Sequence, residues 1–251
     1  MTTIDQNEIE KFEKIAQEWW DPNGKFKPLH DFNPIRLKFF KNKICQYYNL
    51  QEDLLTPFTN LKILDVGCGG GLVSLPIARL GANLTAIDAS EKNINIAKIH
   101  AGKSGVNNIN YLCKTSEDLA KEINDFSQDD NQKFDVIIAL EVIEHVANVA
   151  EFIESLSKIL KPNGILFIAT LNRTIKSLLC AKIAVEYILR WLPQGTHDWQ
   201  KFLLPSEIEN YASKNQLKLL EIQGFSLNII KNEWKLSNNI DINYCMIFKK
   251  N

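Results

Sequence analysis

Two carboxylates and one imidazole lie within five residues of each other in the stretch E-V-I-E-H. Glu141 and Glu144 are three positions apart, and His145 is four positions from Glu141. On a helical turn, this spacing places the three side chains on one face. Such a set could hold a divalent metal with open positions, or supply a general base. The alternative is a capped helix start, where acids favour the helix dipole and His145 is only hydrogen-bonded.

A second candidate site is the glycine-rich stretch 61–71, which reads L-K-I-L-D-V-G-C-G-G-G. Its apolar residues predict a buried strand, and its glycines predict a tight turn into a helix with free N–H groups. A dinucleotide fingerprint starting at Gly67 and Gly69 would need a third glycine where the chain has Leu72. Asp88 ends L-T-A-I-D, about 20 residues further on, the usual distance for a carboxylate that binds ribose hydroxyls. This order of strand, glycine loop, helix, strand and acid predicts a nucleotide-type cofactor site. The alternative is a purely structural turn.

Strand and helix patterns alternate through the middle of the chain, which predicts an α/β fold with a doubly wound parallel sheet. The tail stretches 217–225 and 241–248 each add a strand, making seven. The other predicted strands are 61–66, 84–88, 109–113, 134–140 and 164–170, with helices at 72–80, 91–104, 117–124 and 149–160. The carboxyl ends of the strands must position the candidate residues, because ligands of open α/β sheets bind there.

The N-terminal region predicts two helices that cap this sheet. Residues 5–20 carry one apolar face. Asn33 could cap a second helix, with Pro34 at its first position, that runs to about Tyr48. We expect 1–251 to be a single domain, with 1–58 as an N-terminal helical cap rather than an independent unit.

Bulk composition excludes several classes of protein. The chain has 251 residues, 45% of them hydrophobic, and a net charge of -1, so it lacks the basic footprint of a nucleic-acid-binding protein. Its five cysteines form no C-x-x-C pair, which predicts reduced thiols, a cytoplasmic location and no zinc site. The polar N-terminus is unlike a signal or transit peptide, and no apolar stretch reaches the length of a membrane span.

Residues 175–192 predict an amphipathic helix between the fifth strand and the tail. Lys176, Lys182, Glu186 and Arg190 fall on about one third of the helical wheel, and apolar residues fill most of the rest. Such a helix could lie on a bilayer surface, cover a substrate as a lid, or pack on the sheet. We treat 173–204 as the corresponding insertion.

The pattern D-x-G-x-G-G-G resembles the first motif of class I S-adenosylmethionine-dependent methyltransferases. Longer blocks resemble the ubiquinone-biosynthesis O-methyltransferase family over residues 12–244: W-W-D-P-N-G-K-F-K-P-L-H, N-P-I-R, L-D-V-G-C-G-G-G, E-V-I-E-H-V, T-L-N-R-T and G-T-H-D-W. The resemblance implies a Rossmann-like, seven-stranded sheet with an antiparallel last strand. It also implies methylation of polyprenylated catechols, including 2-polyprenyl-6-hydroxyphenol and 3-demethylubiquinol, with S-adenosylmethionine as the donor.

The resemblance also assigns roles to residues. Glu141, Glu144 and His145 match the family's magnesium positions, so they are both the expected metal ligands and the candidate catalytic residues. In the wider family, an acid after the third strand often meets adenine; here Thr115 stands at that position. The expected cofactor contacts are Arg36, Asp65, Gly67, Gly69, Asp88, Thr115, Ser116 and Leu140.

The implied chemistry needs a deprotonated acceptor. A phenol has a pKa of about 10, so a bound cation must stabilise the phenolate or His145 must take the proton. A prenylated acceptor favours peripheral membrane contact through 173–204, and other ubiquinone-biosynthesis proteins are possible partners. Two alternatives stay open: a methyltransferase with a soluble acceptor, and a scaffold that binds the cofactor without turnover. The intact cluster at 141–145 argues against the scaffold.

Overall fold

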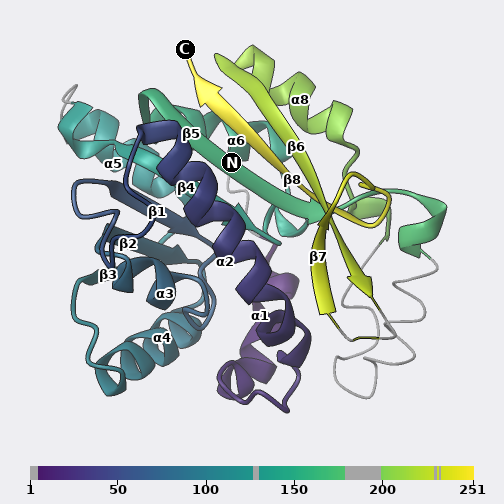
Figure 1. Ribbon diagram of the computed structural model, residues 1–251, viewed down its shortest axis with the longest axis horizontal. Helices are drawn as coiled ribbons and strands as arrows, with labels where there is room; N and C mark the ends of the chain where they lie inside the picture. Colours follow the sequence, from purple (N-terminus) through teal and green to yellow (C-terminus); the bar gives the residue numbers. More distant parts are fainter. Residues whose placement is uncertain (1–4, 127–129, 179–198, 229–230, 232) are drawn as a thin grey trace.

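One mixed sheet runs through the molecule, in the order β3-β2-β1-β4-β5-β8-β6-β7 (Figure 1). The computed structural model describes residues 5–126, 130–178, 199–228, 231 and 233–251, and eight strands lie within this part of the chain. The strands are β1 (Lys62–Val66), β2 (Asn83–Asp88), β3 (Ile109–Cys113), β4 (Phe134–Leu140), β5 (Leu160–Leu171), β6 (Leu217–Asn228), β7 (Glu233–Ser237) and β8 (Asn243–Lys250).

The strand directions confirm the doubly wound prediction. Strands β1 to β5 are parallel to one another, and β8 runs antiparallel between β5 and β6. The predicted count of seven is one short, because β7 pairs with the outer edge of β6. The stretch E-W-K-L-S is held there partly by a tertiary contact, since Trp234 stacks on Phe32 of an N-terminal helix at 4.2 Å. The short local pattern did not reveal it.

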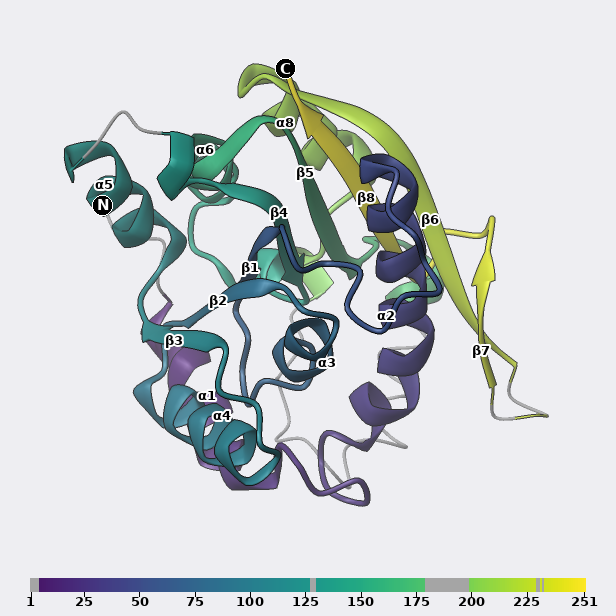
Figure 2. The same ribbon diagram turned by 60° about the vertical axis from the view of Figure 1, so that its left-hand side comes forward.

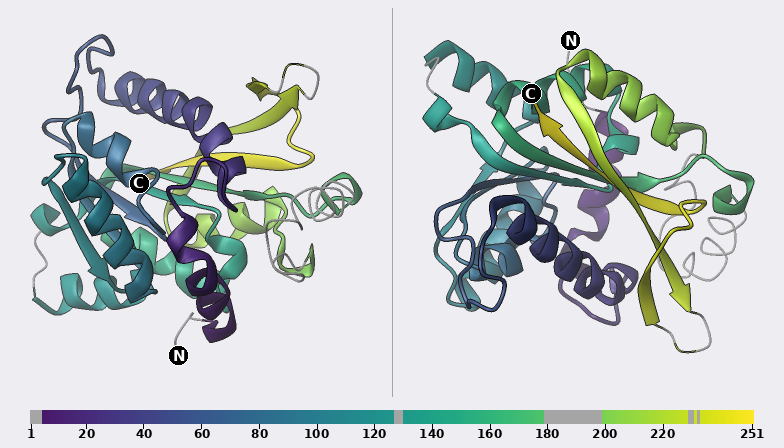
Figure 3. Two further views of the ribbon diagram at one scale, coloured as in Figure 1. Left: turned by 90° about the horizontal axis from the view of Figure 1, so that it is seen from below. Right: turned by 45° about the horizontal axis from the view of Figure 1, so that its top comes forward.

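Helices cover both faces of the sheet, as Figures 2 and 3 show. Residues of α2 (Lys27–Tyr48) and α3 (Ser74–Arg79) share one buried cluster with the sheet, and α4 (Glu91–Lys103) extends that layer. Residues of α5 (Ser116–Phe126), α6 (Val149–Ile159) and α8 (Pro205–Lys214) share the cluster on the opposite face. The strand interiors are therefore apolar on both sides, as parallel strands require.

The N-terminal helices differ from the prediction at their ends. The stretch predicted as one helix, 5–20, forms α1 (Gln6–Ile15) and a 3-10 turn, η1 (Ala16–Glu18). The second helix starts at Lys27 rather than at Pro34, because Pro28 occupies the first turn, where its missing N–H breaks no helical bond. Pro34 therefore lies inside α2, where the burial of Phe39 and Phe40 offsets the lost hydrogen bond.

Part of the chain between β5 and α8 cannot be compared with its prediction. A helix starts at Ile175, but residues 179–198, which include Cys180 and the G-T-H-D motif, lie outside the described residues. The chain resumes with the 3-10 turn η4 (Trp199–Lys201). Among the helices that are described, none has the length and apolar character needed to cross a bilayer.

Candidate active site

The glycine-rich turn after β1 is shaped by left-handed backbone and by close packing. Gly67 has a φ of 67° and Gly69 a φ of 53°. A Cβ atom at Gly67 would lie 2.2 Å from Cγ2 of Val142, in the segment that leaves β4. Glycine alone adopts this backbone readily and leaves room for the neighbouring loop. The turn is therefore held against the carboxyl end of β4, where a ligand of such a sheet would bind.

Asp88 connects this turn to the end of β2. Its Oδ2 atom accepts a hydrogen bond of 2.9 Å from the backbone N–H of Gly69. Its Oδ1 atom accepts from the N–H of Ser90 at 2.9 Å and from Nδ2 of Asn93 at 3.1 Å. Burial raises the pKa of Asp88, and the three N–H donors oppose that rise. A carboxylate has about four acceptor sites, so this one keeps capacity for a further donor such as a hydroxyl.

Asp65 is also an expected cofactor contact, but the hydrogen-bond partner of its carboxyl is a residue of the following helix. Its carboxyl accepts a 2.5 Å hydrogen bond from Oγ of Ser74, at the start of α3. The side chain is buried, and burial raises its pKa to about 7. This hydrogen bond therefore holds the start of α3, the helix that follows the glycine turn.

The corner after β3 holds the two residues expected near adenine. Thr115 caps α5, with Oγ1 accepting from the backbone N–H of Asp118 at 3.1 Å. Ser116 is buried, and its hydroxyl accepts from Oγ of Ser155 in α6 at 2.8 Å. The structure turns the Ser116 hydroxyl toward the helical layer, away from its neighbour Thr115.

Arg36 reaches the exit of β4 from α2. Its Nη1 atom donates to Oε1 of Glu141 at 3.0 Å, and Nη2 donates to Asn33. The guanidinium is buried, lies 4.4 Å from the centroid of Phe32, and has a lowered pKa because burial disfavours its charge. Its Nε atom has no hydrogen-bond partner among the described residues. This donor, beside Leu140 at the end of β4, fits an anionic group such as a carboxylate.

The expected metal cluster at 141–145 is not assembled as the spacing predicted. Glu141 has a φ of 53°, and a 3-10 turn, η3 (Ile143–His145), follows it in place of an α-helical turn. The three side chains therefore have separate partners: Glu141 binds Arg36, Glu144 binds Thr170, and His145 binds an N-terminal residue. The helical turn that the spacing assumed is not formed, because Glu141 has a positive φ and a 3-10 turn follows it.

These side chains do not fit a magnesium site in this arrangement. No group of three or more His, Cys, Asp or Glu side chains in the described part of the chain could hold a metal ion. Burial raises the pKa of Glu144, and its Oε1 atom has no partner among the described residues. Magnesium prefers oxygen ligands in octahedral geometry. Here one carboxylate is neutralised by Arg36, and His145 offers nitrogen.

Glu8 is a site residue that the sequence did not reveal. Its Oε2 atom lies 3.0 Å from Nδ1 of His145, although 137 positions separate the two residues. Burial lowers the pKa of His145, but the hydrogen bond to Glu8 and the charges of Glu144, Glu8 and Glu141 outweigh it, so the net pKa is raised. The hydrogen bond from His145 in turn holds the pKa of Glu8 well below its usual range. Nothing in the local pattern of α1 distinguishes Glu8 from its acidic neighbours.

Trp19 and Trp20 bring the N-terminal segment onto the glycine turn. The Trp19 indole stacks on Phe26 at 3.7 Å, and a Cβ atom at Gly69 or Gly70 would lie 2.4 Å from it. Nε1 of Trp20 donates to the carbonyl of Gly70 at 2.8 Å. Glycine is thus needed at these positions because an indole of the same chain packs against them. The W-W pair in the sequence indicates only that the segment is apolar.

Comparisons with known proteins agree with this architecture. Residues 37–222 match the family model described as a methyltransferase domain. The ubiquinone biosynthesis O-methyltransferase of Pelagibacter ubique is 50% identical over 251 residues, covering 100% of both chains. The protein of the same name from Bartonella tribocorum is 49% identical over 249 residues, covering 99% of this chain and 97% of that protein.

Solved structures share the fold at low sequence identity. Magnesium protoporphyrin IX methyltransferase from Synechocystis, solved with bound SAH, has a TM-score of 0.60 and 18% identity over 98% of this chain and 95% of that one. A SAM-dependent methyltransferase from Thermotoga maritima, a possible histamine N-methyltransferase, has a TM-score of 0.61 and 13% identity over 97% and 100%. The fold and the full-length identity to curated relatives show that this chain belongs to the ubiquinone biosynthesis O-methyltransferase family.

Proposed function

We propose that this protein is an S-adenosylmethionine-dependent O-methyltransferase that methylates phenolic hydroxyls of polyprenylated catechols in ubiquinone biosynthesis. The two acceptors are 2-polyprenyl-6-hydroxyphenol and 3-demethylubiquinol. The observation that carries the proposal is the bond between Asp88 and the glycine turn. This bond supports the proposal because it joins a carboxylate suited to ribose hydroxyls to the glycine turn at one edge of the sheet, in a chain of this family.

Several side chains have suitable chemistry for the cofactor. Asp88 has remaining acceptor capacity for ribose hydroxyls, and Arg36 has an unpartnered Nε donor for the cofactor carboxylate. The glycine turn with Gly67 and Gly69, and Leu140 at the end of β4, complete the proposed cofactor contacts, and Val142 and Trp19 already take the space that Cβ atoms at the two glycines would need. Thr115 offers a hydroxyl for adenine. When bound, S-adenosylmethionine would supply an electrophilic methyl group, which an oxygen nucleophile attacks in line with the departing sulfur.

His145 is the proton acceptor in this proposal. Its Nδ1 atom is engaged by Glu8, so proton exchange with the phenol would run through Nε2. The O–H bond of the phenol would break and its proton would go to the imidazole. The phenolate oxygen would form the new bond to the methyl carbon as the bond from that carbon to the sulfonium sulfur breaks, and S-adenosylhomocysteine would leave. General-base catalysis of this kind contributes about 10²–10⁴-fold in rate. We therefore expect His145→Gln to lower kcat by at least that lower factor while cofactor binding is retained.

Magnesium, which the family resemblance implies, stays a separate proposal. To ligate the ion, Glu141 would have to leave Arg36, and Glu144, whose pKa is raised, would have to ionise. No step of the reaction above depends on this rearrangement. Treatment with a chelator, followed by added magnesium, tests it directly.

The insertion 173–204 is the proposed membrane contact and acceptor lid. Nε1 of Trp199 donates to the carbonyl of Thr174 at 3.0 Å, so the chain leaves and returns at one place. Arg173 is anchored to Glu207 at 2.5 Å, and Ile175 is 73% exposed. Because its ends meet, residues 179–198 can be replaced by a short glycine linker. We expect this deletion to abolish sedimentation with anionic liposomes and to spare cofactor binding; unchanged sedimentation would contradict the contact.

The decisive experiment is transfer of labelled methyl from S-adenosylmethionine to a prenylated catechol, beside its unprenylated counterpart. Preferred transfer to the prenylated acceptor is the expected result. Equal or better transfer to the unprenylated catechol would favour a soluble acceptor. Cofactor binding without transfer to either would favour a scaffold. Activity that is lost with chelator and restored by magnesium would support the metal, and activity insensitive to chelator would leave the proton with His145.

A further inference from the structure

Asn93, in the first turn of α4, connects Asp88, the proposed ribose ligand, to the N-terminal segment. Its Nδ2 atom donates to Oδ1 of Asp88 at 3.1 Å, and its Oδ1 atom accepts from Nε1 of Trp19 at 3.0 Å. An indole N–H only donates and an ionised carboxylate only accepts, so these partners determine which way the amide points. The side chain is buried, and it therefore has no water to replace either partner.

Trp19 belongs to a segment that covers the glycine turn. We call residues 5–26, which include α1 and η1, the N-terminal cover. Its small core packs directly on Leu72, the residue after the glycines. The Trp19 ring lies so close to Gly69 and Gly70 that neither position could carry a Cβ atom without displacing it. The hydrogen bond from Trp19 to Asn93 thus secures the cover on the proposed cofactor loop.

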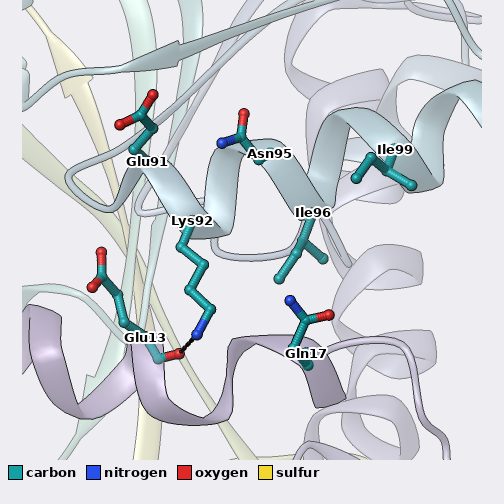
Figure 4. A pocket seen from close by; sticks show the side chains of 7 residues that line it. All are labelled: Glu13, Gln17, Glu91, Lys92, Asn95, Ile96 and Ile99. Atoms are coloured by element: carbon teal, nitrogen blue, oxygen red, sulfur yellow. Dashed lines mark hydrogen bonds between the residues drawn. The ribbon is translucent and has the colours of Figure 1, made fainter.

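The rest of the seam between the cover and α4 is partly packed and partly open. Trp20 stacks on His100 at 3.5 Å, and Ile96 packs against the core of the cover. Figure 4 shows Lys92 and Ile96 of α4 pointing toward Glu13 and Gln17 of the cover, and these residues line a groove of about 440 Å³. A hydrogen bond from Nζ of Lys92 to the carbonyl of Glu13 crosses it. The cover and α4 therefore meet around a groove that side chains do not fill, and the hydrogen bond between Trp19 and Asn93 is one of several contacts that hold the two together.

The same cover reaches the catalytic side of the site. Glu13 accepts a 2.9 Å hydrogen bond from Oγ of Ser90, next to Asp88, and Glu8 contacts His145 after β4. Both acids lie on α1. When α1 packs against the cofactor side through Glu13, it therefore also brings Glu8 to the imidazole of His145.

We propose that Asn93 is a positioning residue that couples cofactor binding at Asp88 to closure of the N-terminal cover. The inference rests on the proposed function, because it requires the ribose to bind Asp88. A ribose hydroxyl bound to Asp88 fixes the carboxylate, the carboxylate fixes the Asn93 amide, and the amide holds Trp19. By linkage, closure must strengthen cofactor binding by the same factor by which the cofactor favours closure. The cover would thus bring Glu8 to His145 when the methyl donor is in place.

The test compares hydrogen exchange of the backbone amides at 8–20 with and without saturating S-adenosylhomocysteine, whose affinity is measured by calorimetry. Asn93→Asp keeps an acceptor for Trp19 but sets a carboxylate against Asp88. Trp19→Phe removes the N–H donor to Asn93 and leaves a smaller aromatic ring, without changing Asn93 or Asp88. Asn95→Asp is the matched control, because Asn95 is exposed on the same helix.

In the wild type, we expect the ligand to slow exchange at 8–20 and at the glycine turn. In Asn93→Asp, affinity should fall at least tenfold, and at saturation the turn should be protected while 8–20 is not. Trp19→Phe should likewise lose protection at 8–20 and raise KM for the methyl donor. Asn95→Asp should behave as the wild type.

Three results would overturn the coupling and leave the proposed function standing. The first is a wild type that binds the ligand and protects the turn but not 8–20. The second is equal protection of 8–20 in the wild type, Asn93→Asp and Trp19→Phe. The third is the same loss of protection in Asn95→Asp as in Asn93→Asp. A wild type that does not bind the ligand would overturn the proposed function and the coupling together.

Discussion

Asp65 should make the stability of this protein depend on pH in a way that one substitution removes. The native carboxyl is buried and has a pKa of about 7, whereas its ordinary value is 3.8. Between these values, the native state binds more protons than the unfolded state, so the free energy of unfolding falls as pH rises. The stabilisation is complete below pH 3.8 and is lost as pH rises through about 7.

The size of this effect follows from the shift. One pKa unit corresponds to about 1.4 kcal/mol, so a shift of about three units is equivalent to ~4 kcal/mol between the two pH limits. Roughly 2.5 kcal/mol of this falls between pH 5 and pH 8.5. Asp65→Asn keeps an acceptor for the Ser74 hydroxyl and cannot ionise. The variant should therefore gain this amount relative to the wild type as pH rises.

Urea unfolding, followed by tryptophan fluorescence from pH 5 to pH 8.5, measures the difference. Asp53→Asn is the matched control, since Asp53 is exposed. Its difference from the wild type should not change with pH. A difference between Asp65→Asn and the wild type that is equally flat would refute the reasoning, because it would mean that the native carboxyl ionises as the unfolded one does.

Three further substitutions test the packing of the site. Gly67→Ala adds a Cβ atom 2.2 Å from Val142 at positive φ, and should lower the free energy of unfolding by about 2 kcal/mol or more, as thermal unfolding would show. Adding Val142→Ala should recover only the part of this loss that comes from the steric clash. Glu141→Gln removes the charge opposite buried Arg36 and should cost about 2–4 kcal/mol, which a paired Arg36→Met should partly restore in a double-mutant cycle. Tyr244→Phe removes a buried hydroxyl that donates to a backbone carbonyl at 2.7 Å, so urea unfolding should register a loss of about 1–2 kcal/mol. An unchanged midpoint in any of these would contradict the contact concerned.

The sheet was largely predictable because its signals are local. Five parallel strands and the antiparallel β8 are continuous apolar runs bounded by glycine, proline and polar breakers, and their alternation with helices determines the layer order. The added strand β7 was missed because it depends on the stacking of Trp234 on Phe32, which no local pattern encodes. The start of α2 was missed because Pro28 and Pro34 are both plausible first-turn residues, and packing decided between them.

The sequence alone determined the backbone-driven parts of the site: the glycine turn, and the carboxylate of Asp88 at the next strand end. Both follow from spacing and from the conformational freedom of glycine, which are properties of neighbouring residues. Tertiary structure decided the rest. The positive φ at Glu141 and the 3-10 turn after it replaced the helical turn that the spacing assumed, and the return of the N-terminal cover brought Glu8 to His145 across 137 positions. Contacts between distant segments depend on the packing of the whole chain, so no local spacing could have predicted them.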